Sequence, residues 1–185
     1  MIRIGVTGHR FLSEMEKIEA GIATALRFIE HKYLGETFVV VSSLAEGADR
    51  LVVRQVLSQP HSSLIVALPL PESDYLNDFA LMESKKEFRH LISQAKEIIE
   101  LSPASSREEA YEAAGNYVLN HCDVLITIWD GLGAQGVGGT GGIVAEALKR
   151  NMPIAWVHAG NRKPGTQEAT SLGESQGTVS YENFS

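Results

Sequence analysis

The sequence is almost free of cysteine: Cys122 is the only one among 185 residues. A single thiol cannot close an intramolecular disulfide, and one thiolate with no neighbouring cysteine does not make a metal cluster. We therefore expect neither a disulfide scaffold nor a metal site. We also expect no cofactor other than the ligand that the protein binds.

Positive charge is also scarce. Lys and Arg number 16 against 23 Asp and Glu, which gives a formal net charge of −7, and the basic residues do not gather in runs. Binding to nucleic acid depends on clustered Lys and Arg that neutralise phosphates. Nucleic acid is therefore not an expected partner of this chain.

Long hydrophobic runs are missing as well. None approaches the ~20 residues needed to cross a bilayer. The segment Met1–Ile4 leads into a strand pattern instead of the apolar stretch of a signal peptide. We expect a cytoplasmic protein with no membrane contact. The 44% of apolar residues are enough to bury the core of one domain of about 150 residues.

Apolar runs alternate with amphipathic segments over residues 1–157, and this alternation is typical of repeated β-α units. The expected strands are Ile2–Val6, Thr37–Val41, Ser63–Ala67, Glu97–Leu101, Val124–Trp129 and Ile154–Val157. The expected helices are Glu14–Tyr33, Ala48–Leu57, Asp78–Gln94, Arg107–His121 and Gly142–Asn151. Several strands are nearly continuous in apolar residues, as in sheets covered on both faces. The predicted fold class is α/β, with a doubly wound, mostly parallel Rossmann-like sheet of six or so strands and helices on both faces.

The composition changes after this domain. Residues 158–185 are rich in Gly, Ser and Thr and show no sustained periodicity. We predict a Rossmann-like domain over residues 1–157, followed by a flexible tail in which Thr178–Tyr181 is a candidate for a short docked strand.

In an open parallel sheet, ligands bind at the carboxyl ends of the strands, so the loops there are the first candidates for a site. The first expected strand is followed by Thr7, Gly8, His9 and Arg10. A glycine turn with a hydroxyl, an imidazole and a guanidinium suits an anion such as phosphate. The alternative is a tight turn whose Arg10 is merely solvated.

The loop after the second strand contains Ser42, Ser43 and Gly47. The two hydroxyls could donate to a phosphate or a ribose, and Gly47 permits a close turn into the next helix. The alternative, which is favoured without further context, is that one serine caps that helix.

The strongest signal is the loop from Gly131 to Gly142, which has seven glycines in twelve residues. It ends in Gly138, Gly139, Thr140, Gly141 and Gly142 and opens into an amphipathic segment. Glycines let the backbone approach a ligand, and a helix amino terminus attracts an anion. The alternative is a hinge without a ligand. Asp130, directly after the preceding strand, is a candidate contact for a ribose hydroxyl.

The segment Gly5–Arg10, the segment Ser42–Arg50 and the run Gly138–Gly142 lie in the order, and on the loops, seen in the SLOG superfamily of Rossmann-like domains. The resemblance covers nearly all of residues 1–157. The stretch from Ala110 to Gly131 looks like a bacterial branch distinct from the family's DNA-processing proteins and LOG phosphoribohydrolases.

The resemblance implies a nucleotide or nucleotide-derived ligand at these loops. In LOG enzymes a glutamate completes the motif P-G-G-x-G-T-x-x-E. Here Ala145 stands at that position and Glu146 follows it, which makes Glu146 the candidate catalytic residue. The leading hypothesis is a protein that senses or sequesters a nucleotide-like molecule. The alternatives are a phosphoribohydrolase that cleaves a nucleoside monophosphate and a homo-oligomeric interaction module, in the simplest case a dimer.

Overall fold

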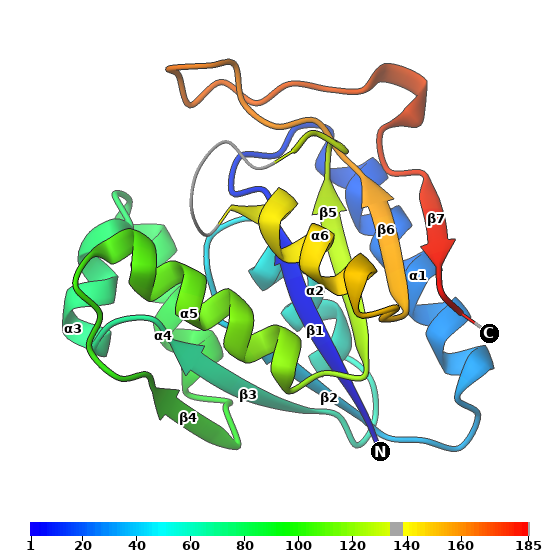
Figure 1. Ribbon diagram of the computed structural model, residues 1–185, viewed down its shortest axis with the longest axis horizontal. Coiled ribbons are helices and arrows are strands. Elements are labelled where there is room, and N and C mark those ends of the chain that lie inside the picture. Colours follow the sequence, from blue (N-terminus) through cyan, green and yellow to red (C-terminus); the bar gives the residue numbers. More distant parts are fainter. Residues whose placement is uncertain (134–138, 185) are drawn as a thin grey trace.

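A computed structural model of the chain describes residues 1–133 and 139–184. It confirms the α/β fold class, with a mostly parallel sheet of seven strands in the order β4-β3-β2-β1-β5-β6-β7 (Figure 1). The strands are β1 Ile2–Gly8, β2 Phe38–Ser42, β3 Ser63–Leu68, β4 Glu97–Glu100, β5 Val124–Trp129, β6 Ile154–His158 and β7 Val179–Glu182. All neighbouring pairs are parallel except β6 and β7.

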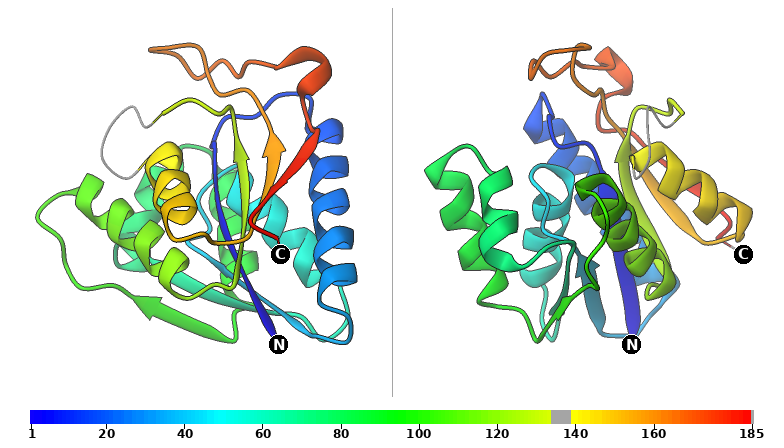
Figure 2. Two further views of the ribbon diagram at one scale, coloured as in Figure 1. Left: turned by 45° about the vertical axis from the view of Figure 1, so that its right-hand side comes forward. Right: turned by 60° about the vertical axis from the view of Figure 1, so that its left-hand side comes forward.

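The helices cover both faces of the sheet, as expected from the apolar strands. They are α1 Met15–Lys32, α2 Ala48–Leu57, α3 Glu72–Tyr75, α4 Met82–Ile92, α5 Arg107–Asn120 and α6 Thr140–Lys149, with 3-10 helices η1 Leu76–Asp78 and η2 Gly173–Ser175. Helices α5 and α6 lie on one face, and α1 and α2 lie on the other (Figures 1 and 2). All five residues of β2 are buried, because helices exclude water from both sides of the sheet.

The helix expected over Asp78–Gln94 is wrong at its start. Helix α4 begins at Met82, and the chain before it forms α3 and η1. Phe79 is extended, with φ −95° and ψ 110°. Its ring lies 5.0 Å from that of Tyr75 and 5.2 Å from that of Phe88. Burial of this aromatic cluster outweighs the local preference for a continuous helix.

The chain after β6 packs against the domain. The candidate strand at Thr178–Tyr181 is confirmed as β7, which pairs antiparallel with β6. Residues 159–178, which we call the C-terminal strap, run along the carboxyl end of the sheet (Figure 1). Gln176 anchors the strap: its side chain is 3% exposed, accepts from the backbone N–H of Gly160 and donates to the carbonyl of Ser13. The boundary at residue 157 between a Rossmann-like domain and a tail stays a prediction.

The strand order reverses at β1. The chain proceeds from β1 outward to β4, then returns to place β5 on the other side of β1. Such a switch point leaves a crevice at the carboxyl ends of the two central strands, here β1 and β5. In the described part of the chain, no helix has both the length and the apolar character to cross a membrane.

Candidate functional site

A cleft of about 1270 Å³ opens at the carboxyl ends of β1 and β5. Its walls come from the β1–α1 and β2–α2 loops, the α3–η1 segment, one side of α5, the start of α6 and the strap. The candidate residues Thr7, Gly8, His9, Arg10, Ser43, Asp130, Gly139, Thr140 and Gly141 all line it. Most of the candidate binding residues from three separate loops therefore meet in one place.

His9 and Asp130 join the two central strands at the floor of the cleft. The backbone N–H of His9 donates to the carbonyl of Ile128 at 2.9 Å, and the N–H of Asp130 donates to Nε2 of His9 at 3.1 Å. Burial lowers the pKa of His9, against an opposing effect of the nearby Asp130 carboxylate. A neutral imidazole with Nε2 as the acceptor fits this arrangement.

Arg10 follows His9 and is exposed at the cleft. Its Cζ lies 5.3 Å from the centroid of the Tyr111 ring, a distance at which a guanidinium is attracted to the ring face. Among the described residues, no carboxylate forms an ion pair with Arg10. The ring orients this cation without neutralising it, so its donors are free for an anion.

The amino terminus of α6 faces the same cleft. Gly139 is the N-cap residue, and its carbonyl accepts from the N–H groups of Gly142 and Ile143. The first turn has no acidic residue. Thr140 and Gly141 line the cleft, and within the described part of the chain no hydrogen bond involves their N–H groups, so this helix amino terminus has donors available for an anion. Gly142 does not line the cleft in the described structure, and Gly138 lies outside the described residues.

Ser42 and Gly47 lie behind the cleft wall. Ser42 is fully buried; its hydroxyl donates to Asp49 at 2.7 Å and accepts from the N–H of Leu44 at 2.9 Å. Gly47 has φ +79°, and a Cβ there would lie 2.4 Å from the carbonyl oxygen of Arg10. Both residues support the loop geometry, and Ser43 is the serine of this loop that reaches the cleft.

Tyr111, at the α5 end of the cleft, was not expected as a site residue from the sequence, whereas Tyr75 and Asp78 lie in a loop that could have formed either a ribose-contacting edge or a proline-shaped turn. The Tyr111 hydroxyl donates to Asp78. Arg107 donates to Asp78 at 2.9 Å and to Asp74 at 3.0 Å. These bonds fasten η1 and α3 to α5, and Tyr75 lies buried beside Tyr111. The partners are about thirty residues apart in sequence, so no local pattern indicates that they meet.

The C-terminal strap forms a further wall of the cleft, which the amino-acid composition of this segment did not indicate. Asn161, Arg162 and Lys163 line the cleft. Cζ of Arg162 lies 5.1 Å from the ring centroid of Phe11, and Lys163 pairs with Glu168 at 2.5 Å. A segment rich in Gly, Ser and Thr resembles a linker in sequence, and its role depends on contacts with the β1–α1 loop.

Four carboxylates line the cleft, and each already has a donor. Asp78 accepts from Tyr111 and Arg107, and Asp130 accepts from the N–H of Leu132 at 3.0 Å. The other two are Asp49, held by Ser42, and Glu46, held by Ser84. Burial raises the pKa of Asp49, although Ser42 and backbone N–H groups act in the opposite direction. The acidic groups are therefore engaged within the protein, whereas Arg10 forms no ion pair with any of the residues that the structure describes.

Glu146 lies on α6 but is not among the described residues that line the cleft. Its carboxylate accepts from Nε of Arg150 at 2.8 Å and lies 3.8 Å from Nζ of Lys149. The hydrogen bond from Arg150 is the main cause that lowers the pKa of Glu146. The structure thus does not bring the candidate catalytic glutamate together with the candidate binding residues.

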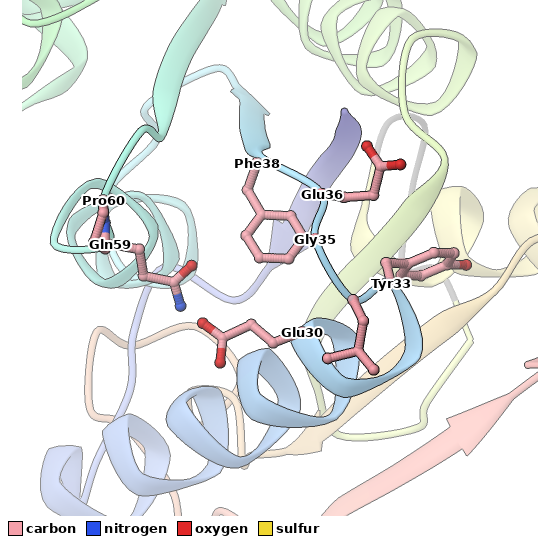
Figure 3. Close-up of a pocket in the computed structure, with 8 residues that line it drawn as sticks. Glu30, Tyr33, Gly35, Glu36, Phe38, Gln59 and Pro60 are labelled. Atoms are coloured by element: carbon pink, nitrogen blue, oxygen red, sulfur yellow. The ribbon is translucent and has the colours of Figure 1, made fainter.

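A second, smaller cavity of about 330 Å³ lies at the amino end of β2 (Figure 3). The side chains of Glu30, Gln59 and Phe38 line it and lie near one another in Figure 3. Glu36, on the rim, pairs with the amino group of Met1. Its described lining includes carboxylates and no Lys, Arg or His, so this cavity is unsuited to an anion.

No protein-family model and no curated protein matches the sequence. Among solved structures, the chain is similar to the X-ray structure of TM1055, a target of the Northeast Structural Genomics Consortium. The TM-score is 0.47 and the sequence identity 16%, over 83% of this chain and 72% of that one. A likeness this distant transfers no activity, so the function is argued from the cleft itself.

Proposed function

We propose that the protein binds a nucleotide or nucleotide-derived phosphate ligand in the cleft at the carboxyl ends of β1 and β5. The likeness of these loops to the SLOG superfamily supports the same class of ligand. No cofactor is needed for this function.

The observation that carries the proposal is the pairing of charges in the cleft. Every lining carboxylate has a donor within the protein, whereas Arg10 and the first N–H groups of α6 have no acceptor among the described residues. A phosphate would satisfy both, because it offers several acceptor oxygens to a guanidinium fork and to a helix amino terminus. The remainder of the cleft has room for a sugar and a base.

The position of the phosphate suggests how the rest of the ligand lies. With the phosphate between Arg10 and Thr140, the nucleoside would extend toward Tyr111, whose partly exposed ring lines the cleft in front of the buried Tyr75. An aromatic side chain can stack on any base, so this end would tolerate different bases.

A thermal-shift screen with AMP, ADP, ADP-ribose, cyclic nucleotides and NAD tests the proposal. A ligand with a dissociation constant of about 10 μM, added at about 1 mM, should stabilise the protein by ~2.7 kcal/mol. For a chain of this length that corresponds to an increase in Tm of about 5–10 °C. Trp129 lines the cleft, so binding should also change tryptophan fluorescence. If no nucleotide raises Tm, the proposal is wrong.

A further inference from the structure

A second guanidinium, that of Arg162 on the strap, lies at the cleft beside the β1–α1 loop. Its Cζ is 5.1 Å from the ring centroid of Phe11, the residue that follows Arg10. The two cations are thus anchored around one two-residue segment, Arg10 on the ring of Tyr111 and Arg162 on the ring of Phe11. Among the described residues, neither forms an ion pair with a carboxylate.

We propose that the cleft has two anion subsites, with Arg10 at one and Arg162 at the other, and that it takes a ligand carrying two linked phosphate groups. This inference rests on the proposed function. A guanidinium that stacks on a ring keeps its N–H donors in the plane and free for phosphate oxygens. Two such groups around one short loop match a diphosphate better than a single phosphate, which one guanidinium and a helix amino terminus would already satisfy.

The backbone of the strap holds Arg162 in position. Arg162 pairs with Ala169 in an antiparallel bridge. The next residue, Thr170, donates from its backbone N–H to the carbonyl of Asn161 at 2.5 Å and accepts from the Ser13 hydroxyl at 2.7 Å. The strap is therefore fastened to the β1–α1 loop at Thr170, the residue after the bridge partner of Arg162. Holding the backbone of Arg162 in place lowers the entropy lost when an anion binds.

The size of the cleft agrees with a ligand larger than a nucleoside monophosphate. Its volume of about 1270 Å³ exceeds the 300–1,000 Å³ typical of small-molecule pockets. The strap forms one wall of this cleft and carries Arg162. A ligand that contacts both Arg10 and Arg162 would use more of this volume than one held by Arg10 alone.

Calorimetric titration with phosphate, pyrophosphate, AMP and ADP, in EDTA at about 150 mM salt, tests the inference. The wild type should bind ADP at least about tenfold more tightly than AMP, a difference of ~1.4 kcal/mol. Arg162→Gln should abolish most of this preference and leave AMP affinity unchanged. Phe11→Leu, which keeps the charge but removes the ring, should reduce the preference in part. Arg89→Gln is the matched control, because Arg89 is exposed on α4 and does not line the cleft.

The outcomes separate the two proposals. If ADP binds no tighter than AMP, or if Arg162→Gln weakens both equally, the second subsite is refuted while nucleotide binding stands. Another outcome is that pyrophosphate binds tighter than phosphate in the wild type but not in Arg162→Gln, while AMP binds no tighter than phosphate and ADP no tighter than pyrophosphate. That result would support the two subsites and refute nucleotide recognition. If none of the four probes binds, both proposals are wrong.

Discussion

Replacement of Gly47 by alanine should destabilise the protein through two separate effects. Gly47 has φ +79° and ψ −120°, and an L-residue in such a conformation costs about 1–2 kcal/mol. Its Cβ would also lie 2.4 Å from the carbonyl oxygen of Arg10 and 2.6 Å from that of His9. Overpacking against a fixed backbone adds about 1–3 kcal/mol. The total of about 2–5 kcal/mol is a large part of the 5–15 kcal/mol that stabilises a typical domain.

Gly35→Ala provides the matched control. Gly35 has φ +81°, yet nothing described lies within 4 Å of the Cβ that alanine would add. The two variants share a positive φ and the reduced freedom of the unfolded chain, so the difference between them reports mainly the steric effect. Urea unfolding should show Gly47→Ala less stable than Gly35→Ala by at least about 1 kcal/mol. Equal free energies of unfolding would refute the packing of the β2–α2 loop against the β1–α1 loop.

Three further predictions concern the cleft. Gly139 has φ −77°, so Gly139→Ala should leave Tm nearly unchanged and weaken AMP binding at least about tenfold in calorimetry, because a methyl group would meet the phosphate. Tyr111→Phe removes the donor to Asp78 and should lower the free energy of unfolding in urea by about 1 kcal/mol; an unchanged value would contradict that bond. Because burial lowers the pKa of His9 in the fold, the unfolded chain takes up more protons there, and stability should fall as the pH decreases below about 6.5. In pH-dependent thermal melts, His9→Gln should reduce this loss, and an unaltered pH profile would argue against a buried neutral His9.

The sheet could be predicted from the sequence because its signals are local. The β5 strand Val124–Trp129 has the expected bounds, and the helix expected over Glu14–Tyr33 is observed over Met15–Lys32. Apolar periodicity reports which residues face the core without reference to distant partners. The start of α4 was wrong because Tyr75, Phe79 and Phe88 pack together across a break in the helix.

The candidate site also contains residues that the sequence predicts and residues whose position depends on tertiary contacts. Arg10 and Thr140 could be found because a parallel sheet brings the loops at its carboxyl ends together. Arg162 and Tyr111 could not be predicted as site residues. Their positions at the cleft depend on how the strap packs and on the hydrogen bonds that join η1 to α5. Ser42 was a candidate ligand donor beside a favoured structural role, and in the fold its buried hydroxyl donates to Asp49. A sequence pattern indicates which residues are chemically suited to a ligand, whereas tertiary contacts decide which ones are free to bind it.

The most direct test of the nucleotide-binding cleft is to map AMP binding by amide chemical shifts in the ¹⁵N-labelled protein. We predict that saturating AMP shifts the resonances of His9, Arg10, Thr140 and Gly141 and leaves those around Phe38, in the smaller cavity, unchanged. Shifts confined to the surroundings of Phe38, or no shifts at all at millimolar AMP, would contradict the assignment of the cleft as the ligand site.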